Sequence, residues 1–383
     1  MQTGIISRVY GAYYNLRPLD APDQELSGQL RGRLRLESRA TKKKAAQDPY
    51  GDGMQERHLL IVGDHVQYSE QKGGPRAGHN VVIESLDKRR NSVYRSTASE
   101  LHALGANLDR AIVLISLSQP RPRWGFLDRF LAACYAGDVP AHIVFSKPDL
   151  IDDADRADLE RMIDLYRAGL GYGVSVLDLV REEPRTEIEA LLGQVRSGVT
   201  LLAGQSGTGK STLMNLLLGG QVQETGSISA STGKGRHTTT NSRLMVSEDL
   251  RMFLIDTPGV KEWGVQHLSA AEILASYPEI NAVIGECRFN DCAHQPEQDG
   301  CAVLALLERS RETYAEYFLN IEEIEENPDV AVPSWSAEFV HPERLRSLSG
   351  MLDSLQYDLR IRTGDFIKPT GRLRKDRITP DDL

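Results

Sequence analysis

The stretch Gly204-Gln205-Ser206-Gly207-Thr208-Gly209-Lys210-Ser211 decides the fold of the middle of this 383-residue chain. An apolar run at residues 199–203 leads into it, and a helix-forming segment at residues 211–216 follows it. Glycines in such a loop let backbone N–H groups turn toward a bound phosphate, and the N-terminus of the following helix adds positive potential. The lysine of this pattern reaches the β- and γ-phosphates, and the serine hydroxyl is placed to ligate magnesium. We therefore predict a phosphate-binding loop, extending to Thr212, on an α/β sheet.

A second motif, Asp256-Thr257-Pro258-Gly259, follows the apolar run at residues 252–255. A carboxylate at the end of a buried strand can hold a magnesium ion through water, and the backbone N–H of Gly259 can sense a γ-phosphate. The tetrapeptide alone also suits a plain turn. Its position after a phosphate loop favours the nucleotide role, so we predict catalytic roles for Lys210 and Asp256 and a magnesium site formed by Ser211 and Asp256.

The third motif, Ser146-Lys147-Pro148-Asp149, follows the apolar run at residues 141–145. A carboxylate at Asp149 can accept hydrogen bonds from the N1–H and the exocyclic amine of guanine, a pair of donors that adenine lacks. Taken alone, the tetrapeptide also fits a helix cap with proline in the first turn. After a buried strand we favour guanine binding by Ser146, Lys147, Pro148 and Asp149, with a backbone loop under the base at Ser175 and Val176.

The order of these three motifs is unusual, because the guanine motif precedes the phosphate loop. In an ordinary GTPase the phosphate loop comes first and the guanine motif comes near the end. The order therefore predicts a G domain whose termini have been moved, which is a circular permutation.

Between the phosphate loop and Asp256 lies Gly233-Lys234-Gly235-Arg236-His237-Thr238-Thr239-Thr240, a cationic, glycine-rich segment that resembles a switch. We predict that a threonine of this segment, Thr238 or Thr239, completes the magnesium shell when GTP is bound. Val260 follows Gly259, where many GTPases keep a glutamine near by to orient water, so intrinsic hydrolysis is expected to be slow. His237 is a candidate to position the water. The alternative is a loop histidine that is solvated or faces nucleic acid.

Three cysteines and a histidine form a separate cluster, Cys287-x4-Cys292-x-His294-x6-Cys301. Three thiolates and one imidazole close a tetrahedral structural zinc site and leave no ligand position open for catalysis. Because such a site organises a domain too small for a large core, we predict one zinc ion that stabilises this region. The fourth cysteine, Cys134, lies in a helix-like apolar stretch and is expected to pack in a core.

Composition and charge restrict the class of protein. The formal net charge is −9, yet residues 1–100 hold 16 Lys and Arg against 12 Asp and Glu, a local surplus of +4. Binding to polyanions depends on such local patches rather than on the total. No apolar run approaches the ~20 residues of a membrane span, and the first residues lack a leader pattern, so we expect a cytoplasmic protein of two or three domains.

The N-terminal part has the pattern of short strands, notably at residues 5–10, 30–36, 58–62 and 81–84. In the stretch 30–36 leucines alternate with arginines, so that Leu30, Leu34 and Leu36 would face inward. The prediction is a small β-barrel of the oligonucleotide-binding type with one basic face. The candidate RNA-binding residues are Arg31, Arg33, Arg35, Lys88, Arg89 and Arg90. The alternative is that these arginines form a merely solvated strand face.

The fold class that follows is a multidomain α/β protein. We predict an OB-like β-barrel at 1–105, a circularly permuted GTPase domain at 106–275, a mostly helical zinc-binding domain at 276–345, and a C-terminal helix with a basic tail at 346–383. Apolar runs at 111–115 and 141–145 predict parallel strands, with a helix at 126–135 between them. A helix is expected over 308–326, and the basic segment 368–377 is expected to be flexible.

With these residues assembled, the chain resembles the ribosome small-subunit-dependent GTPase A family (RsgA/YjeQ), circularly permuted GTPases of bacteria. The resemblance rests on the motif order, on the segments at 204–212, 235–240 and 256–259, and on Cys-Arg-Phe-Asn-Asp-Cys-Ala-His at 287–294. Two departures stand out: Ser146 replaces the usual asparagine, and the spacer before Cys301 is one residue longer than usual.

The resemblance implies a barrel, a permuted G domain and a zinc domain that act late in maturation of the 30S ribosomal subunit. It implies binding to 16S rRNA and GTP hydrolysis, to GDP and phosphate, that the subunit stimulates. The expected cofactors are one structural Zn²⁺ and Mg²⁺ with GTP, and a monomer without membrane contact is expected. The alternative is a nucleotide-gated RNA-binding placeholder in which hydrolysis only triggers release.

Overall fold

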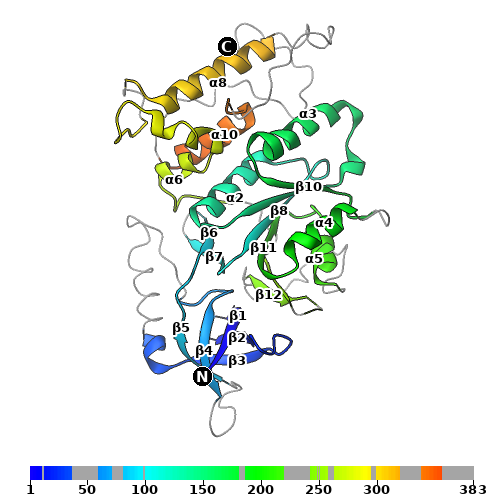
Figure 1. Cartoon of the computed structure of the whole chain (residues 1–383), viewed down its shortest axis with the longest axis vertical. Coiled ribbons are helices and arrows are strands. Elements are labelled where there is room, and N and C mark those ends of the chain that lie inside the picture. Colours follow the sequence, from blue (N-terminus) through cyan, green and yellow to red (C-terminus); the bar gives the residue numbers. More distant parts are fainter. Residues whose placement is uncertain are drawn as a thin grey trace, which may run out of the picture. The chain divides into compact units, whose positions relative to one another are not determined.

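The computed structural model describes residues 1–10, 13–36, 59–70, 81–97, 100–180, 186–219, 242–247, 249, 251–257, 263–294, 299–319 and 338–355 (Figure 1). The chain divides into two compact units. The first unit comprises Met1–Pro122, Ala133–Leu150 and Ser175–His267, and the second comprises Arg123–Ala132, Ile151–Val174 and Leu268–Leu383. The predicted domain boundaries at 105, 275 and 345 stay predictions.

The N-terminal residues form a closed five-stranded barrel with the strand order β1-β2-β3-β5-β4. Its strands are β1 (Gln2–Tyr10), β2 (Tyr13–Pro18), β3 (Leu26–Leu30), β4 (His65–Glu70) and β5 (Val81–Leu86). All described pairs are antiparallel except β3 with β5. Alternate residues of β2, Tyr14 and Leu16, are buried, as are Val66 and Tyr68 of β4. The predicted barrel is confirmed.

Two of the strands predicted for the barrel are wrong. The alternation at 30–36 was expected to continue a strand, but β3 ends at Leu30, opposite Ile83 of β5, and residues 32–36 are helical. Leu36 is 66% exposed, because beyond Leu30 the chain leaves the sheet edge and a short alternating pattern fits a helical turn as well. At 58–62 the apolar residues Leu60 and Ile61 are buried in a turn rather than in a strand.

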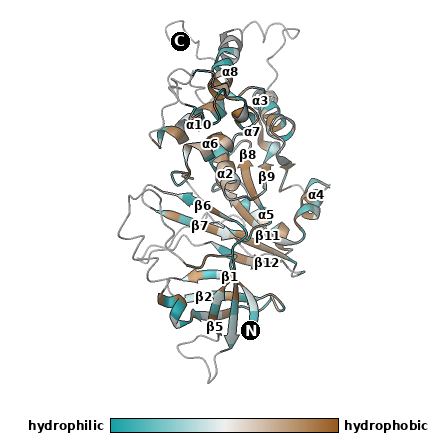
Figure 2. Ribbon diagram, turned by 60° about the vertical axis from the view of Figure 1, so that its left-hand side comes forward, coloured by the Kyte–Doolittle hydropathy of each residue, from teal (hydrophilic) through white to brown (hydrophobic). Residues whose placement is uncertain are grey.

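A six-stranded sheet with the order β10-β9-β8-β11-β13-β12 forms the middle of the chain. The strands are β8 (Arg110–Ser116), β9 (Ala141–Ser146), β10 (Gly173–Leu177), β11 (Gly198–Gly204), β12 (Arg243–Val246) and β13 (Met252–Asp256). β8 is parallel to β9 and β11, and β11 is parallel to β13, whereas β12 is antiparallel to β13. Strands buried on both faces are apolar along their length, as Figure 2 shows for β8 and β11.

Helices pack on this sheet and fix the strand that carries the phosphate loop. α4 (Thr186–Val195) and α5 (Lys210–Leu218) share one hydrophobic cluster with β8, β11 and β13, in which Leu114, Leu202 and Leu213 are fully buried. The predicted helix at 126–135 corresponds to α2 (Trp124–Ala136), where Cys134 is buried as expected. A hairpin of β6 (Ser92–Ser96) and β7 (Leu101–Ala106) precedes β8.

The second unit is mainly helical. It contains α3 (Asp153–Asp164), which runs into a π-helical turn at Leu165–Gly169, α6 (Ala270–Ala275), α7 (Pro278–Asn281), α8 (Ala302–Leu319) and α10 (Pro342–Asp353). The N-terminus of α6 is fixed by a capping box between Ser269 and Glu272. The predicted helix at 308–326 is described only as far as Leu319, and the basic tail lies outside the described residues. Among the helices that are described, none is both long and apolar enough to cross a membrane.

Candidate nucleotide and metal sites

The phosphate loop lies at the carboxyl end of β11, and its shape is set by its glycines and by Thr208. Gly207 and Gly209 have φ angles of 83° and 92°, a left-handed conformation that other residues rarely adopt. The Thr208 hydroxyl is buried and donates a hydrogen bond to the carbonyl of Gln205 at 2.9 Å. A Cβ on Gly204 would lie 3.0 Å from the Thr208 Oγ1, so the loop has no room for a side chain there.

Two charged residues predicted to act in catalysis meet at the carboxyl ends of neighbouring parallel strands. Asp256 ends β13, which pairs with β11, and Lys210 opens α5 directly after the phosphate loop. The Lys210 ammonium forms a short ion pair with the Asp256 carboxylate, and the two side chains are only 12% and 15% exposed. Ser211 follows Lys210 in the first turn of α5. A carboxylate and a hydroxyl are hard oxygen donors of the kind that Mg²⁺ binds, so these residues fit the predicted magnesium site.

The predicted guanine motif is joined to the phosphate loop by Ser146. Its side chain is fully buried at the end of β9, and its hydroxyl donates to the carbonyl of Thr208 at 2.7 Å. A second acceptor, the carbonyl of Ile115 in β8, lies at 3.5 Å. The serine that replaces asparagine therefore does reach the phosphate loop, because the two loops come close together.

The two charged residues of this motif, Lys147 and Asp149, present their polar groups away from the core. Lys147 has a φ of 62°, and its ammonium donates to the carbonyl of Gln119 at 2.5 Å. Pro148 and Asp149 lie in a single 3₁₀ turn, Pro148–Leu150, and Asp149 is exposed. The carboxylate of Asp149 is thus accessible at the same edge of the sheet as the phosphate loop.

The backbone loop that was expected under the base at Ser175 and Val176 needs correction. Both residues lie inside β10, and the Ser175 hydroxyl is 2.9 Å from Nε2 of His142 in β9. Burial lowers the pKa of His142, so this is a neutral contact within the sheet. The segment after β10 comes closer to the phosphate loop, since a Cβ on Gly209 would lie 2.8 Å from Cδ1 of Leu179. No clear signal in the sequence marks this boundary, because Leu179 and Val180 continue the apolar pattern beyond the end of β10 at Leu177.

Several predicted site residues lie outside the described part of the chain. They are His237, Thr238, Thr239 and Gly259. Their roles as water-positioning residue, magnesium ligands and γ-phosphate sensor stay predictions.

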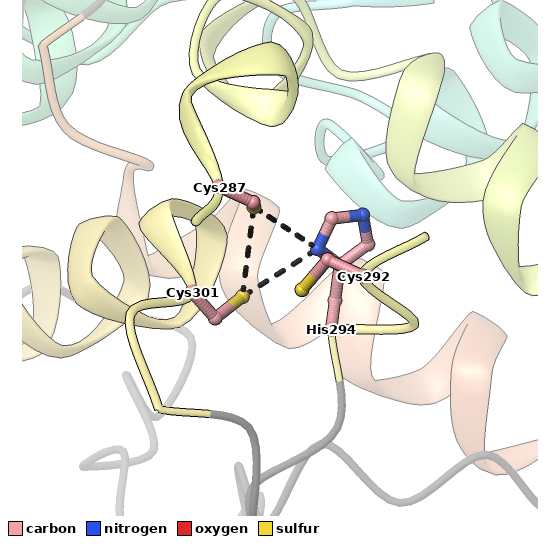
Figure 3. A group of neighbouring side chains, drawn as sticks. All are labelled: Cys287, Cys292, His294 and Cys301. Carbon is pink, nitrogen blue, oxygen red and sulfur yellow. Dashed lines mark hydrogen bonds between the residues drawn. The ribbon is translucent and has the colours of Figure 1, made fainter. Parts of the chain in front are cut away.

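The four residues predicted to bind zinc come together in the second unit, as Figure 3 shows. Their ligand atoms all lie within 4.8 Å of one another. Nδ1 of His294 is 3.6 Å from Sγ of Cys287 and 3.5 Å from Sγ of Cys301, and the two sulfurs are 4.0 Å apart. Ligands bound tetrahedrally to zinc at ordinary bond lengths lie roughly 3.5 to 3.8 Å from one another. The cluster therefore has the size and the donor set of a metal site.

Local backbone structure favours the ligand form of one thiol. Burial raises the pKa of the Cys287 thiol, but hydrogen bonds bring it below its ordinary value. They come from the backbone amides of Ala302 and Val303, where α8 begins, and from the neighbouring thiols of Cys292 and Cys301. Burial, together with the neighbouring thiols of Cys292 and Cys287, raises the pKa of Cys301 to about 11. Because metal binding requires thiolates, a bound cation would offset the burial of Cys301.

The candidate RNA-binding residues differ in what they contact. Arg31, Arg33 and Arg35 are exposed around the helical turn after β3, and Arg31 pairs with Glu84. Lys88 is exposed. In contrast, Arg89 donates to both carboxylate oxygens of the fully buried Asp64, at 2.7 and 2.9 Å.

Arg90 is also held within the protein. It donates to the carbonyl of Leu108 and to the carboxylate of Asp109, at 2.9 and 2.7 Å. Arg89 and Arg90 thus fasten the barrel and the chain that follows it. Sequence reasoning could not separate them from surface arginines, because their acidic partners are distant along the chain.

Comparison with known proteins agrees with the motif order and the fold. The family model described as RsgA GTPase matches residues 86–266. A small ribosomal subunit biogenesis GTPase RsgA from Porphyromonas gingivalis is 34% identical over 321 residues, covering 82% of this chain and 93% of that protein. Small ribosomal subunit biogenesis GTPase RsgA 2 from Bacteroides thetaiotaomicron is 31% identical over 329 residues, covering 84% and 97%.

Solved structures give the same result for the fold. YjeQ from Thermotoga maritima matches with a TM-score of 0.58 and 20% identity over 93% of this chain and 98% of that one. YloQ, described as a circularly permuted GTPase, matches with a TM-score of 0.54 and 20% identity over 86% and 96%. The predicted fold, with its N-terminal barrel, its circular permutation and its C-terminal Cys₃His cluster, is confirmed. The extent and identity of these matches show that the chain belongs to the RsgA GTPase family.

Proposed function

We propose that this GTPase acts in late maturation of the 30S ribosomal subunit, where it binds 16S rRNA and the subunit stimulates hydrolysis of GTP to GDP and phosphate. The names of the relatives, small ribosomal subunit biogenesis GTPases, support the partner. The observation that carries the chemistry is the joining of three separate motifs at one sheet edge. Ser146 bonds to the phosphate loop through Thr208, and Lys210 bonds to Asp256.

The Lys210–Asp256 ion pair supports a simple account of nucleotide binding. When the phosphates of GTP enter the loop, the Lys210 ammonium exchanges Asp256 for the β- and γ-phosphate oxygens. The carboxylate released in this way is then available, with the Ser211 hydroxyl, to hold Mg²⁺, which neutralises the charge that develops on the phosphates. Lys210 stabilises the same charge directly.

Guanine is selected by the exposed carboxylate of Asp149, which accepts two hydrogen bonds from the base, while Lys147 lies along the ring. His237 positions the attacking water, and Thr238 or Thr239 and the amide of Gly259 read the γ-phosphate. The helical turn with Arg31, Arg33 and Arg35, and the exposed Lys88, contact rRNA phosphates. Arg89 and Arg90, which are bonded within the protein, serve to hold the barrel.

The metal cluster binds one zinc ion in a structural role, because all four ligand positions of a tetrahedral ion are occupied by protein atoms. The preference for zinc rests on the three thiolates and one imidazole, since hard cations such as Mg²⁺ take oxygen ligands. We further propose that the protein is a cytoplasmic monomer.

The test is GTP turnover by the purified full chain with and without 30S subunits, with ATP as control. Strong stimulation restricted to GTP is expected. Asp149→Asn should weaken GTP binding without weakening ATP binding, because only guanine needs the carboxylate. Binding of the subunit without stimulated turnover would overturn the enzymatic proposal and favour a placeholder.

A further inference from the structure

The outer face of the β1–β2 hairpin gathers arginines and tyrosines. Arg8 of β1 is opposite Asn15 of β2, and Tyr10 is opposite Tyr13. Side chains directly opposite each other in an antiparallel pair lie on the same face, and residues two apart share that face. Arg17 therefore lies on the face of Tyr13 and Asn15, whereas the intervening residues fill the barrel. Tyr10 and Tyr13 are 45% and 54% exposed.

A third arginine joins this face from the central sheet of the same unit. β1 packs against β12, and Figures 1 and 2 show the two strands side by side. Arg243 begins β12 and is exposed. Partial desolvation beside β1 lowers the pKa of Arg243, and the charges of Arg8 and Arg17 lower it further. The three guanidinium groups are therefore close enough to repel one another.

The described residues around this cluster do not balance its charge. Glu25 is the carboxylate that acts on all three arginines, and it already accepts a hydrogen bond from the Ser7 hydroxyl at 2.7 Å. Arg8 and Arg17 donate to the Tyr10 hydroxyl and to the carbonyl of Pro22, which are neutral acceptors. No ion pair within the described residues includes Arg8, Arg17 or Arg243. The Nε atoms of Arg8 and Arg17 are buried without a hydrogen-bond partner in the described structure.

We propose that Arg8, Arg17 and Arg243, with Tyr10 and Tyr13, form an RNA-binding seam where the barrel meets the central sheet. One guanidinium group can donate two parallel hydrogen bonds to two oxygens of a phosphate. The phosphates of RNA would therefore supply the negative charge that the cluster lacks. Exposed tyrosines beside them can stack on unpaired bases, as aromatic residues do in proteins that bind single-stranded RNA. The seam deepens the proposed function, on which it rests, by naming a second surface that meets the rRNA.

Arg243 also brings the seam close to the predicted magnesium site. In the antiparallel pair of β12 and β13, Arg243 is directly opposite Asp256. An RNA phosphate bound by Arg243 would thus lie one strand away from a residue of the predicted magnesium site.

The first experiment measures binding of the full chain to transcribed 16S rRNA over a series of potassium chloride concentrations. Each phosphate contact contributes about 0.7 to the slope of log K against log salt for single-stranded RNA. The triple variant R8Q/R17Q/R243Q should therefore flatten the slope by about 2. R243Q alone should flatten it by about 0.7, and it changes only an exposed side chain, so it tests the seam even where the triple variant folds poorly.

The tyrosines are tested separately, because stacking contributes little to the salt slope. Y10A/Y13A should weaken binding roughly 5- to 150-fold for each base lost, with an unchanged slope, and Y10F/Y13F should restore it. The matched control for charge is R156Q/R167Q on the second unit, where both arginines are 46–47% exposed and pair within their own helix. This control should bind like the wild type.

Wild-type slopes in both the triple variant and R243Q would overturn the seam. The proposal would also be overturned if the seam variants lost binding to 30S subunits but bound naked 16S rRNA normally. In that case the partner of the seam would be an acidic protein surface. Failure of the proposed function is distinguishable, because in that case the wild type itself would neither bind the subunit nor respond to it.

Discussion

Replacing Ser146 by alanine removes the one hydroxyl that joins the guanine motif to the phosphate loop. The side chain is fully buried, and its hydrogen bond to the carbonyl of Thr208 is 2.7 Å long. In the variant this buried carbonyl loses its donor, which costs about 1–3 kcal/mol of folding stability. The melting temperature should fall accordingly.

The effect on ligands depends on which loops the ligand touches. In the proposed binding mode GDP spans both loops, so it must restore their relative position in the variant, and its affinity should fall about 2- to 13-fold, the equivalent of roughly 0.5–1.5 kcal/mol. Pyrophosphate touches the phosphate loop alone and should bind about as well as before. Calorimetry with both ligands in the presence of magnesium measures the difference.

The matched control is Ser116→Ala. Ser116 is buried at the end of β8, directly opposite Ser146, and its hydroxyl accepts from the amide of Ser118 at 3.4 Å. This variant should leave the affinity for GDP unchanged. The reasoning would be wrong if Ser146→Ala lowered the affinities for pyrophosphate and GDP equally, or if it lowered neither affinity. Either result would mean that the hydroxyl does not align the two loops.

Three further predictions concern stability. Arg89→Ala leaves the buried Asp64 carboxylate without its bidentate partner, so the free energy of unfolding should fall by about 3–5 kcal/mol in urea titrations, whereas the 57%-exposed Arg90 should tolerate alanine better. Burial lowers the pKa of His341, the N-cap of α10, to about 3. Between its unfolded pKa near 6.5 and that value only the unfolded chain binds the proton, so this residue should remove about 2 kcal/mol of stability from about pH 7 to about pH 5. In thermal melts the variant His341→Asn should lose less stability than the wild type over this pH range. An equal loss in the two proteins would contradict the prediction. Cys292→Ser should lower the zinc content measured by mass spectrometry and the melting temperature, and a chelator should have the same effect on the wild type but little on the variant.

The parts of the fold that the sequence predicted are those in which local pattern and function agree. β8 and β11 are continuous apolar runs, and a strand buried on both faces needs no other signal. Gly207 and Gly209 of the phosphate loop have positive φ angles that other residues rarely adopt. The glycines in the sequence therefore predict the shape of the loop. The Cys₃His cluster was predictable because the close spacing of its four residues favours bringing their donor atoms together.

Most features that the sequence did not predict depend on a partner far along the chain. The alternation at 30–36 continues as a helical turn after Leu30 although β5 itself extends to Leu86, because so short an alternating pattern fits a helical turn as well as a strand. Arg89 has the sequence context of a surface residue, yet Asp64 holds it. Asn and Ser at the predicted guanine motif differ in reach, and only the structure reveals the hydrogen bond from Ser146 to the carbonyl of Thr208.

The second unit contains a buried ion cluster of one arginine and two carboxylates. Arg344 is almost fully buried between Asp128 and Glu279, with its guanidinium 4.5 Å from the ring of Tyr277. One arginine with two carboxylates leaves a buried negative charge, and Oδ2 of Asp128 has no hydrogen-bond partner in the described structure. Such a cluster contributes little net stability, because desolvation offsets the attraction, but it penalises any packing that separates its members. The ion cluster therefore specifies how the helices of this unit are arranged more than it stabilises them. We expect further folding free energy from the metal ion that the Cys₃His cluster is proposed to bind, a structural role distinct from the one proposed for Mg²⁺ at the nucleotide site.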